Sequence, residues 1–483
     1  MMKRWNYLVL CCAMATGAAA ASRPLVASSP KPNIIYILAD DLGYGDLSCL
    51  GQEHFQTPNI DALKEKGMFF ANHYSGSTVC APSRSALLTG QHTGHTFVRG
   101  NKEIMPEGQH PIPDEVLLLP EMLKPAGYVS GAFGKWGLGY PGSEGDPLKQ
   151  GFDVFYGYNC QRLGHHYYPF HLWDNEEKVV LDANAGTAKG AYGPELIHEH
   201  TLKFIEDNKD RPFFCYVASI IPHAELAAPE KYMKQFSGII EEGEPYEGVD
   251  EGPELRLGRY QSQAEPHAAF AAMITLLDDQ VGEIVALSEK LGIADNTLII
   301  FTSDNGAHQE GGADPQFFNS NGPYRGYKRD LFEGGVHVPM MAYWPGKIAS
   351  GTTSEHISAF WDMVPTFTEL AGVETPKNTD GLSMVPTLLG KGGQPEHKYL
   401  YWEFHEKGGR IAVRMGKWKG VRYNVLKNPN EPMKLFDLSV DPGEQKNIAA
   451  EHPETVEQIR HIMDGARTHS EIFTFGQTQF KGE

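Results

Sequence analysis

The chain has 483 residues, of which 41% are hydrophobic and 21% are charged, so it can bury a large core in one large or two unequal domains. This is an ordinary globular composition. The formal net charge of −19 argues against nucleic acid and other polyanionic partners, although a local cluster of Lys, Arg and His could still form one anion-binding pocket.

The N-terminus has the features of an export signal. It reads MMKRWNYLVLCCAMATGAAAASRP, with a basic start, an apolar run over 8–14 and small residues over 18–21. We therefore exclude residues 1–21 as a cleavable signal peptide and expect an exported protein, either periplasmic or secreted. A lipoprotein anchor at Cys11 is disfavoured, because a leucine directly precedes that cysteine. No later apolar run approaches 20 residues, so no transmembrane segment is expected.

Strands and helices alternate through most of the chain. Residues 31–41, KPNIIYILADD, predict a buried strand that ends in two aspartates, and 57–67 predict a helix with a proline at its first position and a glycine beyond its end. A strand is predicted over 68–74, a helix and then a strand over 113–137 and again over 194–219, and a long helix over 265–292 before a strand over 297–306. The alternation predicts an α/β domain over 22–390, with a large mostly parallel sheet sandwiched by helices.

The pattern changes after about residue 390. Short strand-like segments lie close together over 399–404, 410–416, 418–424 and 434–440, and an amphipathic helix is predicted near 453–467. Close spacing favours a small antiparallel sheet. Residues 391–483 are therefore expected to form a C-terminal α+β subdomain.

Two pairs of polar residues follow predicted strands. Asp40 and Asp41 come after IIYIL, and Asp304 and Asn305 come after LIIFTS. Because ligands of parallel sheets gather at the carboxyl ends of strands, these side chains are candidates for one metal site. Hard oxygen ligands suit Ca²⁺, with Mg²⁺ as the second choice. Either pair alone could simply cap a turn, but two pairs in the same architectural position favour the metal site.

Four cysteines remain beyond the signal peptide: Cys49, Cys80, Cys160 and Cys215. They are widely spaced, so up to two disulfides are possible and the sequence cannot pair them. Cys80 stands in STVCAPSRSALLTG as an apparently exposed residue at the start of a helix, where backbone N–H groups favour anions. Arg84 lies one turn further on the same face. With a divalent cation beside them, these groups would bind a tetrahedral oxyanion.

At this point the sequence resembles the type I, formylglycine-dependent sulfatases of the alkaline phosphatase superfamily, including arylsulfatase A-like and N-acetylgalactosamine-6-sulfatase-like carbohydrate sulfatases. The match runs from NIIYILADDLGYGD and CAPSRSALLTG through GKWGLG, IPH and FTSDNG to KLFDLSVDPGEQKNIA. The resemblance implies an alkaline phosphatase-like fold. It also implies a maturation enzyme that oxidises Cys80 to formylglycine, and a Ca²⁺ ion held by Asp40, Asp41, Asp304, Asn305 and the modified Cys80.

The resemblance further implies roles for the basic residues. A hydroxyl of the hydrated Cys80 derivative would attack sulfur, and Arg84 would orient and stabilise that hydrate. Lys135 in GKWGLG and Lys328 in YRGYKRD match the sulfate-binding lysines. His223 in IPHAE matches the histidine that protonates the leaving alcohol. Outside this context, a lone lysine or histidine would more simply be a solvated or structural residue.

Two positions depart from the family pattern. Gly137 stands where G-K-W-H-L-G commonly has a histidine that contacts the formylglycine hydroxyl and serves as a base. We hypothesise that His92 or His95, just beyond the helix of Cys80, supplies the missing imidazole. His337 stands in EGGVHVP, where arginine is frequent, and is expected to change only a more distant contact.

The substrate is expected to be an O-sulfated saccharide, such as a galactose or N-acetylgalactosamine sulfate, cleaved from a chain end. The stretch GYNCQRLGHHYYPFHLWD, which contains His165 and His166, has a composition suited to stacking on sugars, although such stretches are more often core. Arg99 and Asn101 are further candidates for ring contacts, and EFHEKGGR could close the rim.

Two alternatives remain open at this stage. A phosphomonoester or phosphonate hydrolase of the same superfamily would share the metal architecture, although CAPSR favours sulfate. A non-catalytic protein that binds sulfated glycans is suggested by Gly137, but Cys80, Arg84, both lysines and all four metal ligands are retained.

Overall fold

The computed structural model describes residues 1–2 and 31–474. Most of the predicted signal peptide, together with the lipoprotein alternative at Cys11, therefore lies outside the described residues. Across the described part, no helix is both long and apolar enough to cross a membrane. Both sheets described below belong to one compact unit that starts at Lys31.

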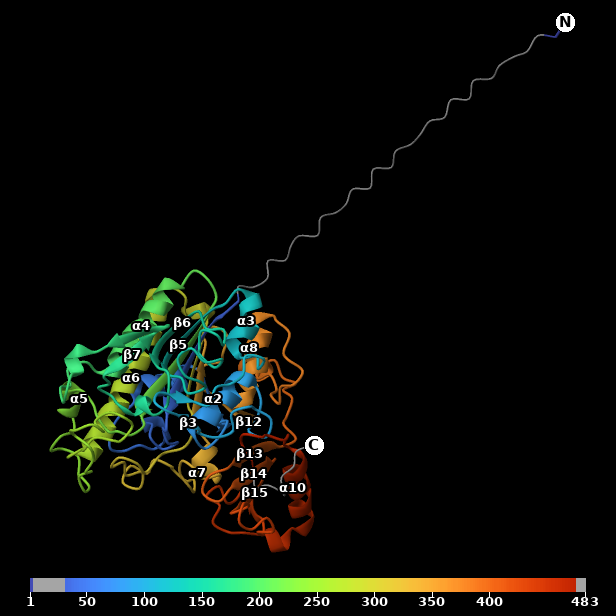
Figure 1. Cartoon of the computed structure of the whole chain (residues 1–483). Helices are drawn as coiled ribbons and strands as arrows, with labels where there is room; N and C mark the ends of the chain where they lie inside the picture. The colour runs from blue at the N-terminus through green and yellow to red at the C-terminus, as the bar shows by residue number, and fades with distance from the viewer. Residues whose placement is uncertain (3–30, 475–483) are drawn as a thin grey trace. The chain divides into compact units, whose positions relative to one another are not determined.

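A ten-stranded mixed sheet organises the N-terminal region (Figure 1). Its strand order is β12, β2, β11, β10, β1, β9, β5, β6, β7 and β8. The five central strands are mutually parallel: β10 (Thr297–Ser303), β1 (Asn33–Asp40), β9 (Phe213–Pro222), β5 (Val129–Lys135) and β6 (Val154–Tyr158). The outer strands include the antiparallel pairings: β12 (Thr352–Ala359), β2 (Met68–Tyr74), β11 (Met340–Tyr343), β7 (His171–Asp174) and β8 (Glu177–Val180). The predicted large, mostly parallel sheet is confirmed.

Helices cover both faces of this sheet because its central strands are apolar on both sides. In β1, Ile35 and Ile37 face one core cluster, whereas Ile34 and Tyr36 face the other. The first cluster includes side chains of α1 (Pro58–Lys66), α4 (Gly193–Asp207) and α6 (Pro266–Lys290). The second includes side chains of α2 (Cys80–Thr89), α3 (Leu119–Leu123), α8 (Met363–Ala371) and α9 (Val385–Leu388). Of these helices, α3 is the one predicted within 113–137. It is short, because proline interrupts that stretch.

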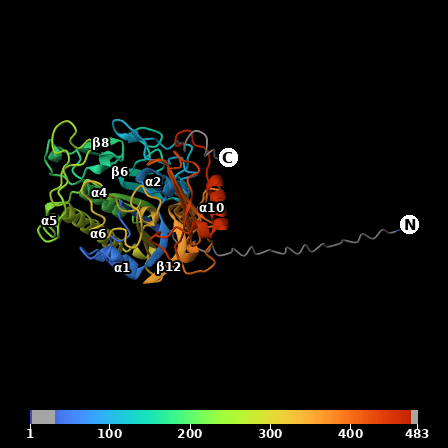
Figure 2. The same ribbon diagram turned by 90° about the horizontal axis from the view of Figure 1, so that it is seen from below.

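A separate four-stranded antiparallel sheet follows, as predicted. It consists of β13 (Leu400–Phe404), β14 (Arg410–Met415), β15 (Trp418–Tyr423) and β16 (Lys434–Asp437), in that order, and α10 (Pro453–Gly465) packs against it. These elements lie on the opposite side of the molecule from α5 (Glu230–Met233) in Figure 1 and Figure 2. Further short elements include β3 (Glu103–Ile104), β4 (Gly108–Gln109) and α7 (Glu333–Val336). A domain boundary near residue 390 stays a prediction.

Candidate active site

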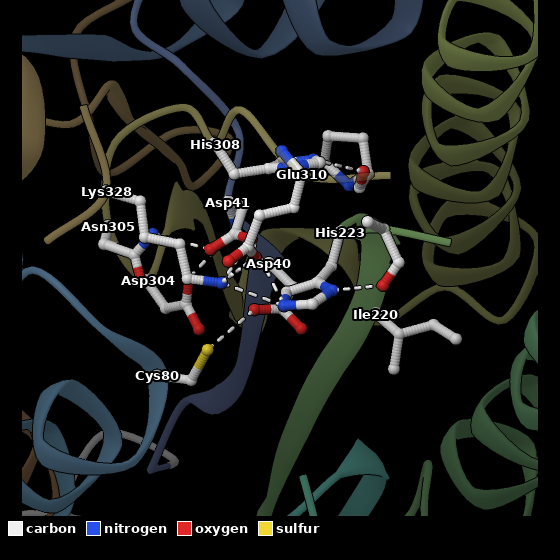
Figure 3. A network of polar contacts seen from close by, with 12 residues as sticks. Asp40, Asp41, Cys80, Ile220, His223, Asp304, Asn305, His308, Glu310 and Lys328 are labelled. Atoms are coloured by element: carbon white, nitrogen blue, oxygen red, sulfur yellow. Dashed lines mark hydrogen bonds and ion pairs between the residues drawn. The ribbon is translucent and has the colours of Figure 1, made fainter. Parts of the chain in front are cut away.

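The two polar pairs meet at the carboxyl edge of the central sheet. Strands β1 and β10 are parallel neighbours, with Ala39 opposite Ser303, so the residues that follow them emerge side by side. The backbone N–H of Asp41 donates to Asp304 Oδ1 at 3.1 Å, and Asn305 Nδ2 donates to Asp41 Oδ1 at 2.7 Å. All four side chains, Asp40, Asp41, Asp304 and Asn305, are fully buried. The structure thus brings together the residues proposed as metal ligands (Figure 3).

The chemistry of this cluster fits a hard divalent cation. Three buried carboxylates converge here, and burial together with the Asp40 and Asp41 carboxylates raises the pKa of Asp304. Asn305 Oδ1 is buried and meets no hydrogen-bond partner among the described residues, which is unusual for a polar atom. Carboxylate and amide oxygens of this kind are ligands that Ca²⁺ and Mg²⁺ prefer.

Each of the three carboxylates also faces a basic side chain. Lys135 Nζ lies 2.6 Å from Asp40, and Lys328 Nζ lies 2.7 Å from Asp41. Arg84 Nη2 lies 2.9 Å from Asp304. Although burial opposes ionisation, Lys135 and the other cations hold the pKa of Asp40 well below its usual range. Both lysines and the arginine therefore lie where the sequence places them, around the acidic cluster.

Cys80 opens α2 and points at this cluster (Figure 3). Its Sγ lies 3.3 Å from Asp40 Oδ1 and 3.5 Å from Lys135 Nζ. The expected exposure is wrong, since the residue is 2% exposed, and the half-cystine alternative is also excluded, because all four described cysteines are free. Burial, followed by the Asp40 carboxylate, raises the pKa of the Cys80 thiol far above neutrality. An unmodified thiol here would stay protonated and would be a poor nucleophile.

Arg84 connects three elements around Cys80. It is buried one turn further along α2, and its Nη1 donates to the carbonyl of Lys135 at 2.6 Å. With its contact to Asp304, the guanidinium ties α2 to the ends of β5 and β10. These contacts hold α2, the helix that begins with Cys80, in place against the ends of both strands.

His223 lies directly beyond β9 with its ring against the same cluster. Its Nδ1 donates to the Ala224 carbonyl, so Nε2 carries the lone pair. Nε2 lies 2.9 Å from Lys328 Nζ and 3.4 Å from Asp41. Burial, reinforced by Lys328 and Lys135, keeps the pKa of His223 well below its usual value. The ring is neutral and accepts a hydrogen bond from the lysine.

The four proposed substrate contacts divide into two groups. His165 stacks on His223, with ring centroids 4.6 Å apart, and Asn101 Oδ1 accepts the Ala81 N–H beside Cys80. Arg99 is buried, and its guanidinium group donates hydrogen bonds to Thr96, Thr468 and Glu403. His166 is also buried, with Nδ1 against Glu225 and Nε2 accepting the Gly258 N–H. Arg99 and His166 are thus both buried and engaged with other parts of the protein, whereas His165 and Asn101 lie against His223 and beside Cys80.

The aromatic stretch over 157–174 mostly packs inside the protein. Tyr167 and Tyr168 belong to the core cluster that also contains residues of α4 and α6. Trp173 and His171 hydrogen-bond to Glu107. Tyr167 and Tyr168 are therefore covered by the protein, whereas His171 and Trp173 are half-buried, and a sugar-stacking role for this loop stays a prediction. From EFHEKGGR, Arg410 contacts Asp330 in the segment that carries Lys328.

The hypothesis that His92 or His95 replaces the missing imidazole is wrong. Both residues follow the C-terminal end of α2, whereas Cys80 opens that helix, and ten helical residues span about 15 Å. The two rings stack on each other, and His95 Nδ1 lies 2.9 Å from Asp380. His337, the second departure, hydrogen-bonds to Glu333 and to the Ala71 carbonyl.

Sequence reasoning missed two residues that border the site. His308 stacks near His223 and its Nε2 lies 3.1 Å from the Pro222 carbonyl. Glu310 lies 3.5 Å from Lys328 and 2.6 Å from Arg329. Both residues come directly after FTSDNG, at the carboxyl end of β10. This position was a signal that could have identified them.

Two family models together match residues 32–468 of the chain. A family model described as Sulfatase matches residues 32–373, and one described as N-sulphoglucosamine sulphohydrolase, C-terminal, matches residues 324–468. N-acetylgalactosamine-6-sulfatase of Mus musculus is 31% identical, covering 94% of this chain and 89% of the relative. Arylsulfatase A of Homo sapiens is 32% identical, covering 97% and 92%.

Solved structures share the fold. Ps i-CgsB in complex with k-i-k-neocarrahexaose matches with a TM-score of 0.75 and 27% identity, covering 94% of this chain and 95% of that one. The phosphonate monoester hydrolase of Agrobacterium radiobacter matches with a TM-score of 0.64 and 22% identity, covering 89% and 94%. At that identity the second match speaks only for the fold, so the fold by itself does not separate sulfate from phosphonate chemistry.

Proposed function

Because the chain belongs to the sulfatase family of sulfuric ester hydrolases, we propose that it removes O-sulfate from a sulfated saccharide, using a formylglycine made from Cys80 and a bound Ca²⁺. The expected substrate is a galactose or N-acetylgalactosamine sulfate at a chain end. One observation carries the proposal: Cys80 Sγ lies within reach of both Asp40 and Lys135, inside a cluster that combines hard metal ligands with three buried cations.

The ligands and the cofactors have defined tasks in this proposal. Asp40, Asp41, Asp304 and Asn305, with the modified side chain at 80, would hold the cation, which supplies positive charge against a sulfate oxygen. Formylglycine supplies, in its hydrated form, a hydroxyl nucleophile that the protonated thiol cannot match. A maturation enzyme is a necessary partner, since cysteine itself lacks that hydroxyl.

The buried cations bind the anion. With the carboxylates balanced by a bound cation, the ammonium groups of Lys135 and Lys328 would be free to face sulfate oxygens and to stabilise the charge that develops during transfer. Arg84 keeps its contact with the Lys135 carbonyl and so holds position 80 in line.

His223 delivers the proton to the leaving alcohol. Its Nδ1 proton is held by the Ala224 carbonyl, so Nε2 is the nitrogen that would take up a proton from water and pass it to the alcohol. Lys328 Nζ, 2.9 Å away, donates a hydrogen bond to that nitrogen and remains a cation. His165, stacked on this ring, and Asn101, beside Cys80, are placed to meet the sugar.

The saccharide part of the proposal draws on relatives. One is named for N-acetylgalactosamine 6-sulfate, and one structural neighbour was solved with a neocarrahexaose. The export signal predicted over residues 1–21 is consistent with a periplasmic or secreted enzyme that meets glycans outside the cytoplasm.

Three measurements test the proposal. The first is turnover of 4-nitrophenyl sulfate against 4-nitrophenyl phosphate, where preference for phosphate would favour the phosphomonoester or phosphonate hydrolase alternative. The second is mass spectrometry of the Cys80 peptide from the native source, where an unmodified thiol in active protein would contradict the formylglycine. The third is a screen of defined sulfated sugars with Cys80→Ala as the inactive control, where binding without sulfate release would favour a glycan-binding protein.

A further inference from the structure

The space beside Gly137 is occupied by another side chain. Gly137 has a φ of +91°, and a side chain at this position would place its first carbon 2.3 Å from Gln161 Nε2 and 2.7 Å from Gln161 Cγ. Contacts this short do not occur between real atoms, so no residue larger than glycine fits while Gln161 stays in place. The glycine at 137 and the glutamine at 161 are therefore a matched pair.

The carboxamide of Gln161 has no hydrogen-bond partner among the described residues. The residue is 4% exposed, and Nε2 is fully buried without a hydrogen bond. No described residue bonds to its Oε1 either. Asn159, two residues earlier and 1% exposed, likewise has both amide atoms buried and unpartnered. Buried amides are normally satisfied, so their isolation indicates a site that a ligand or water completes.

These amides border the proposed reaction centre. Residues 159–161 run beside the end of β5, since Trp136 N–H donates to the Tyr158 carbonyl and Gly137 N–H to the Asn159 carbonyl. Lys135, two residues before Gly137, lies 3.5 Å from Cys80 Sγ. The same loop continues to His165, whose ring stacks on the ring of His223.

We propose that Gln161 replaces the histidine that related sulfatases carry at position 137, and that its Nε2 donates a hydrogen bond to an oxygen of the bound sulfate group. The inference rests on the proposed sulfatase function and adds a residue to it. A carboxamide has no ionisation in the physiological range, so this contact is a fixed donor that neither takes up nor releases a proton. Gln161 thus binds the anion but cannot serve as the base for which the histidine is assigned.

Gln161→Met tests this with a matched control. Methionine has a similar length and no polar group, and the side chain of Gln161 makes no hydrogen bond to residues 31–474 that the substitution would remove. We therefore expect a thermal midpoint equal to or above that of the wild type, with kcat/KM for 4-nitrophenyl sulfate lowered about 100-fold. Gln52 is equally buried, but its Nε2 donates to the Gly45 and Phe318 carbonyls and its Oε1 accepts two backbone N–H groups. Gln52→Met should lower the midpoint and leave kcat/KM of the folded fraction near that of the wild type.

Inhibition by inorganic sulfate gives a readout that does not depend on the chemical step. Gln161→Met, or Gln161→Ala if the methionine variant does not fold, should bind sulfate about tenfold more weakly. Unchanged kcat/KM and unchanged sulfate inhibition would overturn the assignment, as would a loss of stability that matches the loss of activity. The wild type is assayed first, because absence of sulfate release there would overturn the proposed function itself rather than the role of Gln161.

Discussion

Replacing Lys135 by methionine tests how the site balances its buried charges. Lys135 ends β5, and its Nζ lies 2.6 Å from Asp40 Oδ2 with both side chains fully buried. Lys135 is also the strongest of the cations that lower the pKa of Asp40 against the effect of burial. The substitution keeps the length of the side chain and leaves a buried carboxylate without its main partner.

The expected destabilisation can be estimated from this geometry. At an effective dielectric constant of 20, two charges 2.6 Å apart interact by about 6 kcal/mol. Arg84 stays 3.7 Å from Asp40 and offsets part of that loss. Breaking a buried pair by removing one partner costs about 3–5 kcal/mol, and we expect the free energy of unfolding to fall by this amount in chelator. Excess Ca²⁺ should reduce the loss, because the ion itself would compensate Asp40.

Urea unfolding with and without Ca²⁺ measures the effect, with turnover of 4-nitrophenyl sulfate in parallel. Lys203→Met is the matched control, because Lys203 Nζ is 2.7 Å from Asp207 but both side chains are largely exposed. It should change little in either assay. Turnover by Lys135→Met should in addition fall about 100-fold or more, since the substitution removes a positive charge that binds the anion. If both variants unfolded at the same urea concentration, the reasoning from burial and charge would be refuted.

Three further outcomes are expected. Treatment with EDTA should lower the thermal midpoint and stop turnover. Adding Ca²⁺ at 100 times its dissociation constant should restore about 2.7 kcal/mol of stability. A thermal midpoint that EDTA leaves unchanged would argue against a bound ion. Burial lowers the pKa of His397, but Asp362 at 2.8 Å outweighs it and raises that pKa overall. The stability this pair adds is therefore full below the unfolded value of about 6.5 and is lost as the pH rises through the folded pKa, so the difference in urea midpoint between wild type and His397→Gln should shrink toward alkaline pH. Lys419→Met should destabilise the fold by about 3–5 kcal/mol in urea, because Lys419 Nζ lies 2.6 Å from buried Glu333, and adding Glu333→Gln should recover much of that loss.

The clustering of the proposed metal ligands was predictable because regular structure positions them. Buried β-branched runs identify β1 and β10 as central strands, and parallel neighbours must end at the same edge. Asp41 and Asp304 are more than 260 residues apart in sequence, yet this rule alone brings them within 3.1 Å, measured from the Asp41 N–H to the Asp304 carboxylate. The elements of the C-terminal sheet were predictable for a similar reason, since four short apolar segments in close succession favour antiparallel neighbours.

The surroundings of the site were not predictable, because loops determine them. Periodicity does not say where an irregular segment runs, so Arg99 looked available although Glu403 and Thr468 from the C-terminal region cover it. His92 looked close to Cys80 along the sequence, but the ten-residue helix α2 lies between them. Gln161 gave no signal in the sequence, because only the folded structure shows that its side chain occupies the space beside Gly137.

The charges of the site connect its metal to its substrate. Asp40, Asp41 and Asp304 face Lys135, Lys328 and Arg84, so the buried cluster is balanced when all six are ionised. In that state each cation is paired with a carboxylate and has little attraction left for an anion. Adding a divalent ion gives the same six residues an excess of two positive charges, enclosed where water screens them poorly. Under the proposed function, an occupied metal site would therefore let a chain with an overall charge of −19 attract a sulfate ester to this cluster.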